Sequence, residues 1–456
     1  MQILVERHAI TRTNGLSRHF AEADRLCFAG KNLYNTGRYL RNQFYRVTGQ
    51  NLSYADTEKN LRARREYREL PAKVAQLVRR QLLEDEKNHF AAITAWQASP
   101  EKFNRKPNFP GYKEKNGRTT LEFNAQAVSK KALKHGVVRL GGTAIEVNTK
   151  VPPEKFRSAR LVPRTSCYVL EVLYEVPDVA PDPNAKHVLA LDLGVENTVS
   201  AVFLKESGAE TRVAATFILC GRRLKSINQY FNKIIAAHKS ALAGHRTLDI
   251  VHLDEQGQAT YGLVPLRTSR RIGRAWLKRQ NQMNAILHRM SHTLIRFATS
   301  RGIGRLVVGY NPGWKNESPM GDASNQNFVQ IPFRALIDQL RYKGAQHGVE
   351  VIETGESYTS KASALDGDDV PDYTPGMVGK PVFSGRRQKR GLYKTAAGHL
   401  VNADINGALN IYRKYKGKLK EQVQFCSESL VGLCSSPVRV EISLDKPDQW
   451  KIMPAA

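Results

Sequence analysis

Two aspartates at the ends of apolar segments are the residues of this chain best placed to do chemistry. Asp192 ends an apolar run that begins at Val188, and Gly194 then opens a turn before a second β-branched run. A carboxylate at a buried strand end is costly unless it is paired or binds a cation. Asp192 therefore either holds a metal ion or only starts a turn. Asp404, in the helix-like segment NADINGALN, is either a second ligand or a helix-capping residue.

The order of segments around these aspartates predicts how they meet. Apolar periodicity indicates three strands, two long helices, a strand, a helix, a strand and a last helix starting near Asn402. The residues are 187–193, 198–204 and 213–219 for the strands, 223–242 and 269–300 for the helices, then 305–310, 333–347 and 349–354. Residues 244–265 predict a hairpin-bearing insertion between the long helices. This is the element order of the ribonuclease H-like α/β fold.

A third carboxylate should end the fourth strand of such a fold. Nucleases of this fold use two hard divalent cations about 4 Å apart, which require oxygen ligands. The fourth strand ends at Gly309 and offers no acid, but the next strand ends in VIETGESYTS. We favour Glu356, just beyond that strand, over Glu353, which lies inside it. Three further candidates belong to a segment that resembles an exposed turn: Asp366, Asp368 and Asp369.

The first 180 residues predict a separate α+β region. Short strand-like segments in 1–16 and 100–180 are expected to form a small β-barrel, which a basic helical domain at 17–99 interrupts. Helical spacing places Tyr45 and Phe90 on apolar core faces and Arg38 and Arg41 on solvated basic faces. The Pro-rich segment 178–186 predicts a domain boundary. The whole chain is thus expected to be a multidomain α+β protein.

Charge and cysteine content restrict the partners. The formal net charge is +28, which favours a polyanion such as nucleic acid. No apolar run reaches the roughly 18 to 20 residues that span a bilayer, so we expect no membrane partner. The N-terminus lacks the apolar core of a signal peptide. Five scattered cysteines indicate a reducing compartment. We therefore expect a cytoplasmic, nucleoid-associated protein.

At these residues the sequence resembles the TnpB family, RNA-guided nucleases of insertion sequences that are related to type V CRISPR effectors. The segments that carry the resemblance are ALDLGVENTVS, VVGYNPGWK, NQNFVQIPF, YKGAQHGVEVIETGESYTSKAS, SGRRQKRGLYKT and NADINGALNIYRK. The resemblance implies a RuvC-like nuclease domain at 186–425, with Asp192, Glu356 and Asp404 as catalytic residues and ligands of a two-metal Mg²⁺ site. In a subgroup of the family the fourth-strand acid is replaced by one before the YTS segment, which matches Glu356.

The resemblance also has departures. Most family members carry a four-cysteine zinc ribbon, but no cysteine occurs here between Cys220 and Cys426. We predict no structural zinc, and expect hydrogen-bonded turns or a β-hairpin to hold the insertion at 355–400, which would bind the target nucleic acid. Residues 426–456 are expected to be a flexible tail. The oligomeric state is not predicted.

The leading hypothesis is a guide-RNA-directed DNA endonuclease that cuts beside a short motif, with guide RNA and target DNA as partners. Three alternatives are a nuclease-deficient RNA-guided repressor, a CRISPR-associated miniature type V effector and a transposase. For nucleic-acid contacts we select three residues of a basic helix and four of the hairpin, each of which could equally be solvated surface: Lys73, Gln76 and Arg80, and Arg386, Arg387, Lys389 and Arg390.

Overall fold

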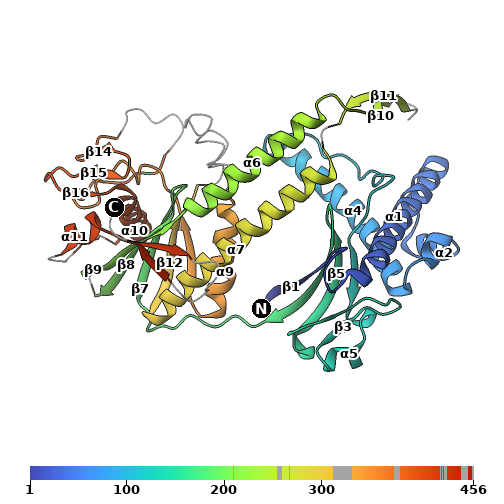
Figure 1. Cartoon of the computed structure of the whole chain (residues 1–456), viewed down its shortest axis with the longest axis horizontal. Coiled ribbons are helices and arrows are strands. Elements are labelled where there is room, and N and C mark those ends of the chain that lie inside the picture. Colours follow the sequence, from blue (N-terminus) through green and yellow to red (C-terminus); the bar gives the residue numbers. More distant parts are fainter. Residues whose placement is uncertain are drawn as a thin grey trace. The chain divides into compact units, whose positions relative to one another are not determined.

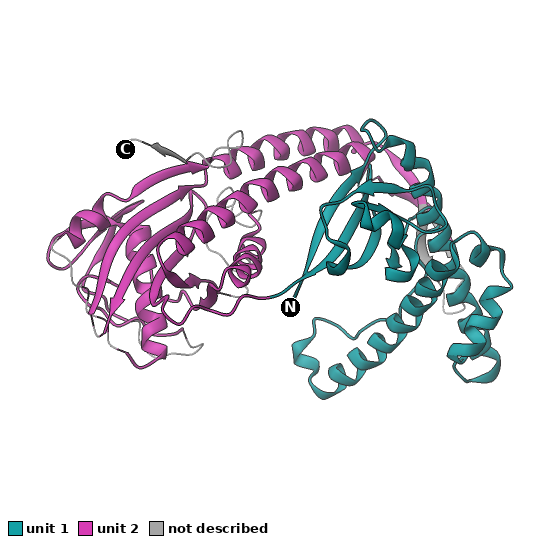
Figure 2. Cartoon of the chain, turned by 90° about the horizontal axis from the view of Figure 1, so that it is seen from below, with its two compact units in different colours: residues 1–177 teal, residues 178–456 magenta. Residues whose placement is uncertain are grey.

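The chain divides into two compact units, residues 1–177 and residues 178–456 (Figures 1 and 2). The structure, a computed structural model, describes every residue except 209, 254–258, 267, 312–330, 374–380, 422, 424, 426–428, 443–449 and 454–456. The boundary between the units coincides with the start of the Pro-rich segment at 178–186. Among the described residues, no helix has the length and apolarity needed to cross a lipid bilayer.

Unit 1 contains an open antiparallel sheet. Its strand order is β1 (Gln2–Ile10), β6 (Tyr168–Val176), β5 (Phe156–Pro163) and β2 (Leu121–Asn124). A separate hairpin pairs β3 (Val137–Arg139) with β4 (Glu146–Asn148). The structure therefore corrects the prediction of a β-barrel, because the described strands leave β1 and β2 as the edges of an open sheet. The physical reason is that helices, rather than more strands, bury the apolar face of this sheet.

The helices between residues 17 and 99 are basic, as the sequence predicted, and two of them, α1 and α4, are long. The structure has α1 (Phe20–Thr48), α2 (Tyr54–Arg62), α3 (Arg65–Arg68), α4 (Ala72–Ala98) and α5 (Lys130–Lys134). Single 3₁₀ turns lie at Ser17–His19, Pro100–Lys102, Ala125–Ala127 and Pro153–Lys155. Helix α1 ends where Gly49 takes a left-handed conformation with φ of 69°, which a glycine adopts without strain. Leucines of α1 and α4 and of the sheet share one core.

Four side chains on these helices lie opposite to where helical spacing placed them. Arg38 and Arg41 are buried, and both bind the buried carboxylate of Glu86 on α4. Tyr45 and Phe90 are exposed instead. An arginine is buried where a carboxylate on a neighbouring helix neutralises it, and periodicity within one helix does not reveal that partner.

Unit 2 is organised around a mixed sheet. Its first five strands in chain order are β7 (His187–Leu193), β8 (Asn197–Ser207), β9 (Glu210–Cys220), β12 (Ile303–Gly309) and β13 (Glu350–Thr354). In space they lie in the order β13-β12-β7-β8-β9. β7, β8 and β9 are antiparallel, whereas β12 runs parallel to both β7 and β13. The elements occur in the order that the sequence predicted.

Helices cover both faces of this sheet. On one face, Leu189 and Leu191 of β7 pack in a core with α7 (Arg270–Ser300) and α9 (Phe333–Gln346). On the other, Val188 and Ala190 pack against α10 (Ala403–Lys418). The alternation follows from the period of two in a strand. Helix α6 (Arg222–Leu242) packs against α7, and the hairpin of β10 (Arg246–Leu253) and β11 (Ala259–Pro265) lies between them in the chain (Figure 1).

The structure also corrects the prediction of a flexible tail at residues 426–456, because its described parts form a helix and two strands. Helix α11 (Leu430–Ser435) buries Cys434, and β17 (Val438–Ile442) pairs in parallel with β9. β18 (Trp450–Met453) then pairs with β17 at the edge of the main sheet. The alternating VRVEI sequence suits a strand with one buried face, and the open edge of β9 gives it a partner.

Candidate active site

Asp192 lies at the end of β7 on the face that α10 covers. It follows Val188 and Ala190 at intervals of two, so all three point to the same side of the sheet. Gly407 of α10 lies directly against it: a Cβ atom there would be 2.7 Å from Asp192 Oδ2. A glycine at this position is what allows the helix to approach the carboxylate so closely.

Asp404 lies in the first turn of α10, but another residue caps the helix. The side chain of Asn402 accepts hydrogen bonds from the backbone N–H groups of Asp404 and Ile405, at 3.0 and 3.2 Å. Asn402 therefore has the capping role that the sequence left open for Asp404. The Asp404 carboxylate instead accepts a 2.6 Å hydrogen bond from Asn197 Nδ2, which begins β8.

Glu356 fills the place where the fourth strand lacks an acid. Gly309 ends β12, on the same face as Val307 and hence on the α10 side. A Cβ atom at Gly309 would lie 2.7 Å from Glu356 Oε1, 2.8 Å from Glu356 Cγ and 2.5 Å from Ile411 Cδ1. The backbone N–H of Glu356 donates to Asn311 Oδ1 at 3.0 Å, which fixes the start of the loop. The side chain of Glu356 thus occupies the space that a side chain at 309 would need.

Glu353, the competing candidate, points to the other face. It pairs with Val308 across β12 and β13. Its carboxylate binds two arginines of α9, Arg334 at 2.9 Å and Arg341 at 2.8 Å. These ion pairs account for Glu353 as a surface residue of the α9 side, and the geometry favours Glu356 as the partner of Asp192 and Asp404.

The three carboxylates lie close enough for their charges to interact. Burial raises the pKa of Asp192 well above its ordinary value, the neighbouring Glu356 and Asp404 raise it further, and Arg387 opposes them. Burial also raises the pKa of Glu356 to about 8. Crowded acids in a low-dielectric environment resist full ionisation unless a cation neutralises them. Such crowding is typical of functional sites.

The donor set fits a hard divalent cation. Carboxylate oxygens are the ligands that Mg²⁺ prefers. Glu356 Oε1 is inaccessible to solvent and has no hydrogen-bond partner in the described part of the chain, so it is an acceptor without a donor. The side chains are not in a ligating arrangement, since no group of three or more acidic, His or Cys side chains among the described residues is gathered closely enough to hold a metal ion. Asp404 instead accepts a hydrogen bond from Asn197.

One basic side chain of a small sheet, Arg387, lies beside these carboxylates. Strands β14 (Arg386–Lys389), β15 (Leu392–Lys394) and β16 (Leu400–Asn402) form the hairpin-bearing sheet that was predicted in place of a zinc ribbon. Arg387 Nη2 lies 4.0 Å from Asp404 Oδ1, and Arg390 Nη2 lies 3.2 Å from Glu196 Oε1. The other two candidates, Arg386 and Lys389, are exposed on β14.

Hydrogen-bonded turns hold the rest of this insertion. Asp366 Oδ2 accepts from the Ser363 and Ser384 hydroxyls and from the Ala396 backbone N–H. Asp368 Oδ2 accepts from the backbone N–H groups of Ser363 and Ser384. The two aspartates cross-link segments far apart in the sequence, which accounts for them without a metal role.

The three candidates on α4 belong to unit 1. Lys73 and Arg80 are exposed, and Gln76 is half-buried. Arg80 Nε pairs with Glu84 Oε1 at 2.8 Å, one turn along the same helix. The exposure of this face is compatible with nucleic-acid contact and equally with a solvated helix surface.

Sequence reasoning missed Asn197 and Arg439. Asn197 donates to Asp404, and Arg439 Nη1 of β17 lies 3.5 Å from Asn197 Oδ1. The available signal for Asn197 was the turn at Gly194. Because the chain reverses there, two residues after Asp192, a polar residue that begins the next strand lies at the same end of the sheet as Asp192. Arg439 gave no such signal, because its strand joins the sheet through a long-range pairing.

Two models of known protein families match parts of this chain. The family model OrfB_IS605, described as a probable transposase, matches residues 171–315, and the Cas12f1-like TNB domain matches residues 333–411. Asp192 and Gly309 fall in the first segment, and Glu356 and Asp404 in the second.

Among individual proteins, the chain is similar to the TnpB-like protein ORF457 of Acidianus two-tailed virus. The two are 25% identical over 245 residues, which cover 53% of this chain and 45% of the viral protein. The match thus spans less than half the length of that curated relative. Together with the two domain matches, it confirms the resemblance to the TnpB family that the sequence motifs indicated.

Solved structures of Cas12 effectors also resemble the chain. A Cas12f1–guide RNA–target DNA complex has a TM-score of 0.45 and 14% identity, over 85% of this chain and 81% of that one. The mini-RNA-guided endonuclease Cas-phi3 has a TM-score of 0.46 and 10% identity, over 90% and 92% of the two chains.

Proposed function

We propose that the chain is an RNA-guided DNA endonuclease whose unit 2 is a RuvC-like, ribonuclease H-like nuclease domain. The observation that carries this proposal is the convergence of Asp192, Glu356 and Asp404 on the α10 face of the sheet, with the Glu356 side chain in the place of the acid missing at Gly309. The strand order and the TnpB-family matches support the same conclusion.

In this proposal Asp192, Glu356 and Asp404 hold two divalent cations, most simply Mg²⁺. Cations at such a site supply an activated water and stabilise the leaving oxygen of a phosphodiester. The residues of the chain set the geometry. Asn197 donates a hydrogen bond to one oxygen of Asp404 and so orients its carboxylate. Gly407 has no side chain and therefore lets α10 pack close to Asp192 on the sheet.

Binding the substrate requires positive charge, because three carboxylates repel a phosphate backbone. Arg387 lies beside Asp404, and Arg390 pairs with Glu196. Both would contact the phosphates of the strand to be cut, with Arg386 and Lys389 along the same hairpin. Lys73, Gln76 and Arg80 of α4 would contact the DNA motif beside the target. The net charge of +28 gives the whole chain the affinity for nucleic acid that this function requires.

The test begins with RNA that co-purifies with the chain. Its sequence defines a matching DNA duplex, which the purified complex should cut in Mg²⁺ and not in the presence of a chelator. Asp192→Ala and Glu356→Ala should each slow cutting by about 100-fold or more, since a metal site contributes several kcal/mol to the barrier. Glu353→Gln removes a charge three residues away on the other face of the sheet and should cut normally.

Two results would refute the proposal. Normal cutting by the Glu356→Ala variant would show that Glu356 is not a ligand of the catalytic cations. Guide-dependent DNA binding with no cutting by the wild-type chain in any divalent cation would instead support a nuclease-deficient repressor, the alternative that Gly309 keeps open.

A further inference from the structure

Unit 1 carries an exposed aromatic surface that the proposed nuclease site does not use. It consists of His89 and Phe90 on α4 and of Phe109 and Tyr112 in the segment RKPNFPGYK that follows α4. We call these four residues the aromatic surface. The exposed fractions are 51% for Phe90, 47% for Phe109 and 55% for Tyr112, which is unusual for large apolar rings so close together.

The rings of the aromatic surface pack against one another by their edges. The ring centroids of His89 and Phe109 are 5.1 Å apart, those of His89 and Phe90 5.4 Å, and those of Phe90 and Phe109 6.3 Å, all T-shaped. Tyr112 continues the same surface along α1, where its hydroxyl lies 3.4 Å from Asn42 Nδ2. The rings support each other while about half of each of the three large residues stays open to solvent.

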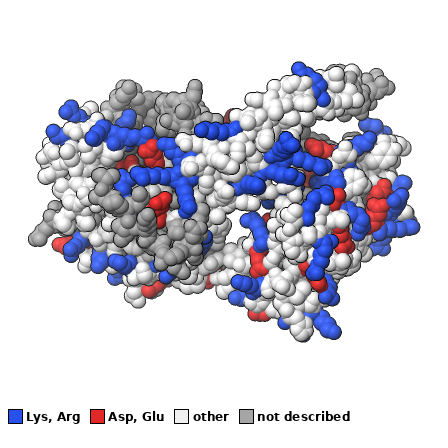
Figure 3. All heavy atoms as spheres, viewed as in Figure 1, with Lys and Arg blue, Asp and Glu red and all other residues white. Residues whose placement is uncertain are grey.

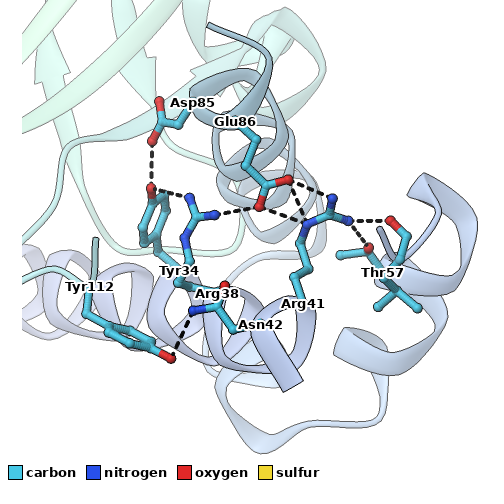
Figure 4. Close-up of polar contacts among 9 residues, drawn as sticks. Tyr34, Arg38, Arg41, Asn42, Thr57, Asp85, Glu86 and Tyr112 are labelled. Carbon is cyan, nitrogen blue, oxygen red and sulfur yellow. Dashed lines mark hydrogen bonds and ion pairs between the residues drawn. The ribbon is translucent and has the colours of Figure 1, made fainter. Parts of the chain in front are cut away.

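A buried charge network joins α4 to α1 and α2 (Figure 4). Glu86 of α4 binds Arg38 at 2.5 Å and Arg41 at 2.6 Å, and Arg41 also binds Thr57 of α2 at 2.9 Å. The Arg38 guanidinium, which is fully buried, lies 5.0 Å from the centre of the Phe109 ring. A cation held by a carboxylate against an aromatic ring limits the motion of that ring. The Phe109 ring is thus held against the buried network before any ligand binds, and it packs in turn against His89 and Phe90.

The segment that carries Phe109 and Tyr112 is rich in basic residues. Between residues 102 and 118 the chain has one acidic residue, Glu114, and six basic ones: Lys102, Arg105, Lys106, Lys113, Lys115 and Arg118. Lys106 and Arg105 are exposed at the start of this segment. In the view of Figure 3, basic side chains are more widespread than acidic ones. Exposed rings within a basic surface match a ligand that has flat faces and negative charge, which describes nucleic acid with unpaired bases.

We propose that the aromatic surface stacks unpaired bases of the RNA that the chain carries, which rests on the proposed RNA-guided function. Phe90 and Phe109 offer the faces for stacking, and Arg105 and Lys106 attract the phosphates that join the stacked nucleotides. RNA is the occupant because its loops and ends present unstacked bases, whereas the bases of a DNA duplex are stacked on each other. Rings held in advance lose little conformational entropy on binding.

The experiment measures binding of the full chain, freed of nucleic acid at high salt, to a fluorescein-labelled oligouridylate of about 15 nucleotides. The matched probe is an abasic ribose-phosphate strand of the same length, which keeps the phosphates and lacks the bases. The double variant Phe90→Ala/Phe109→Ala should bind oligouridylate about tenfold or more weakly, because stacking on one ring is lost for each substitution. Its affinity for the abasic strand should not change.

Two control variants separate stacking from folding. Phe90→Tyr/Phe109→Tyr keeps both rings and should bind oligouridylate as the wild type does. Tyr230→Ala removes a ring that is 60% exposed on α6, outside the aromatic surface, and should bind both strands normally. Equal weakening for the base-bearing and abasic strands would overturn stacking, as would unchanged binding of oligouridylate. A loss for duplex DNA as large as that for oligouridylate would overturn the assignment to unpaired RNA.

The outcomes are distinguishable from those of the nuclease proposal. If only the stacking proposal fails, the double variant retains its co-purified RNA and cuts matched DNA like the wild type. If only the nuclease proposal fails, no variant cuts matched DNA, while the loss of oligouridylate affinity in the double variant remains.

Discussion

The close approach of Glu356 to Gly309 makes an exchange of the acid between the two positions testable. Gly309→Asp places a carboxylate at the end of β12, but its Cβ would lie 2.7 Å from Glu356 Oε1 and 2.5 Å from Ile411 Cδ1. Such contacts force the neighbours to move. We therefore expect the single substitution to displace Glu356 and to impair cutting, even though it adds an acid.

The magnitudes follow from packing and from the charge of the site. Overpacking costs about 1–3 kcal/mol, which corresponds to a fall in the melting temperature of roughly 2–4 °C per kcal/mol for a domain of this size. A fourth carboxylate added to a crowded site increases the repulsion further. Glu356→Ala alone should keep its stability and lose about 100-fold or more in cutting rate. In Gly309→Asp/Glu356→Ala the new aspartate gains the space of the deleted side chain, and cutting should recover by at least about tenfold over Glu356→Ala.

The assay is single-turnover cleavage of a duplex matched to the bound RNA, with thermal unfolding of each variant beside it. Gly417→Ala is the matched control, because a Cβ atom at Gly417 meets nothing within 4 Å and the helical backbone accepts alanine. It should cut normally and gain slightly in stability. If the double variant stays as inactive as Glu356→Ala while it remains folded, Glu356 does not substitute for a fourth-strand acid, and the reasoning is refuted.

Three further outcomes are expected. Glu86→Ala should lower the free energy of unfolding by about 3–5 kcal/mol in a urea titration, because it leaves two arginines buried without their carboxylate; a loss below about 1 kcal/mol would show that the network relaxes. Asn197→Ala should slow cutting by about 10- to 100-fold with guide affinity unchanged, since it frees the Asp404 carboxylate to turn; normal cutting would contradict this orienting role. Burial lowers the pKa of Lys343 to about 8, so the unfolded chain binds more protons than the folded one between about pH 8 and the ordinary lysine pKa near 10.4, and stability should rise with pH across that window. Lys343→Met should flatten that rise relative to wild type, and an unchanged pH dependence would exclude Lys343 as its source.

Local patterns in the sequence were sufficient for most of unit 2. The continuous apolar runs VLAL and VVG, together with the three- and four-residue spacing in α7 and α10, predicted these elements to within a few residues. These signals are strong because each element buries one face on a common core. The open sheet in unit 1 and the strands after α11 were not predicted correctly, since which sheet edge a short strand joins depends on distant partners.

The candidate site divides in the same way. Asp192 and Asp404 could be selected from residue type and position alone. For the third carboxylate, the sequence favoured Glu356 over Glu353 but did not exclude Glu353. The tertiary structure gives that choice a physical basis, because Glu353 faces the arginines of α9 whereas the Glu356 side chain occupies the space beside Gly309. The periodicity of the sequence does not predict toward which face of the sheet a side chain beyond the end of a strand will point.

By itself, the sequence determined the order of the elements around Asp192, the large positive charge and the lack of zinc-ribbon cysteines, because each depends on residues near one another or on composition. Only the tertiary structure decided that Asn402 rather than Asp404 caps α10, and that Arg38 and Arg41 are buried on Glu86. These features join residues from separate elements. Their energies depend on the distance, burial and charge of partners that chain folding brings together, and no local spacing encodes those quantities.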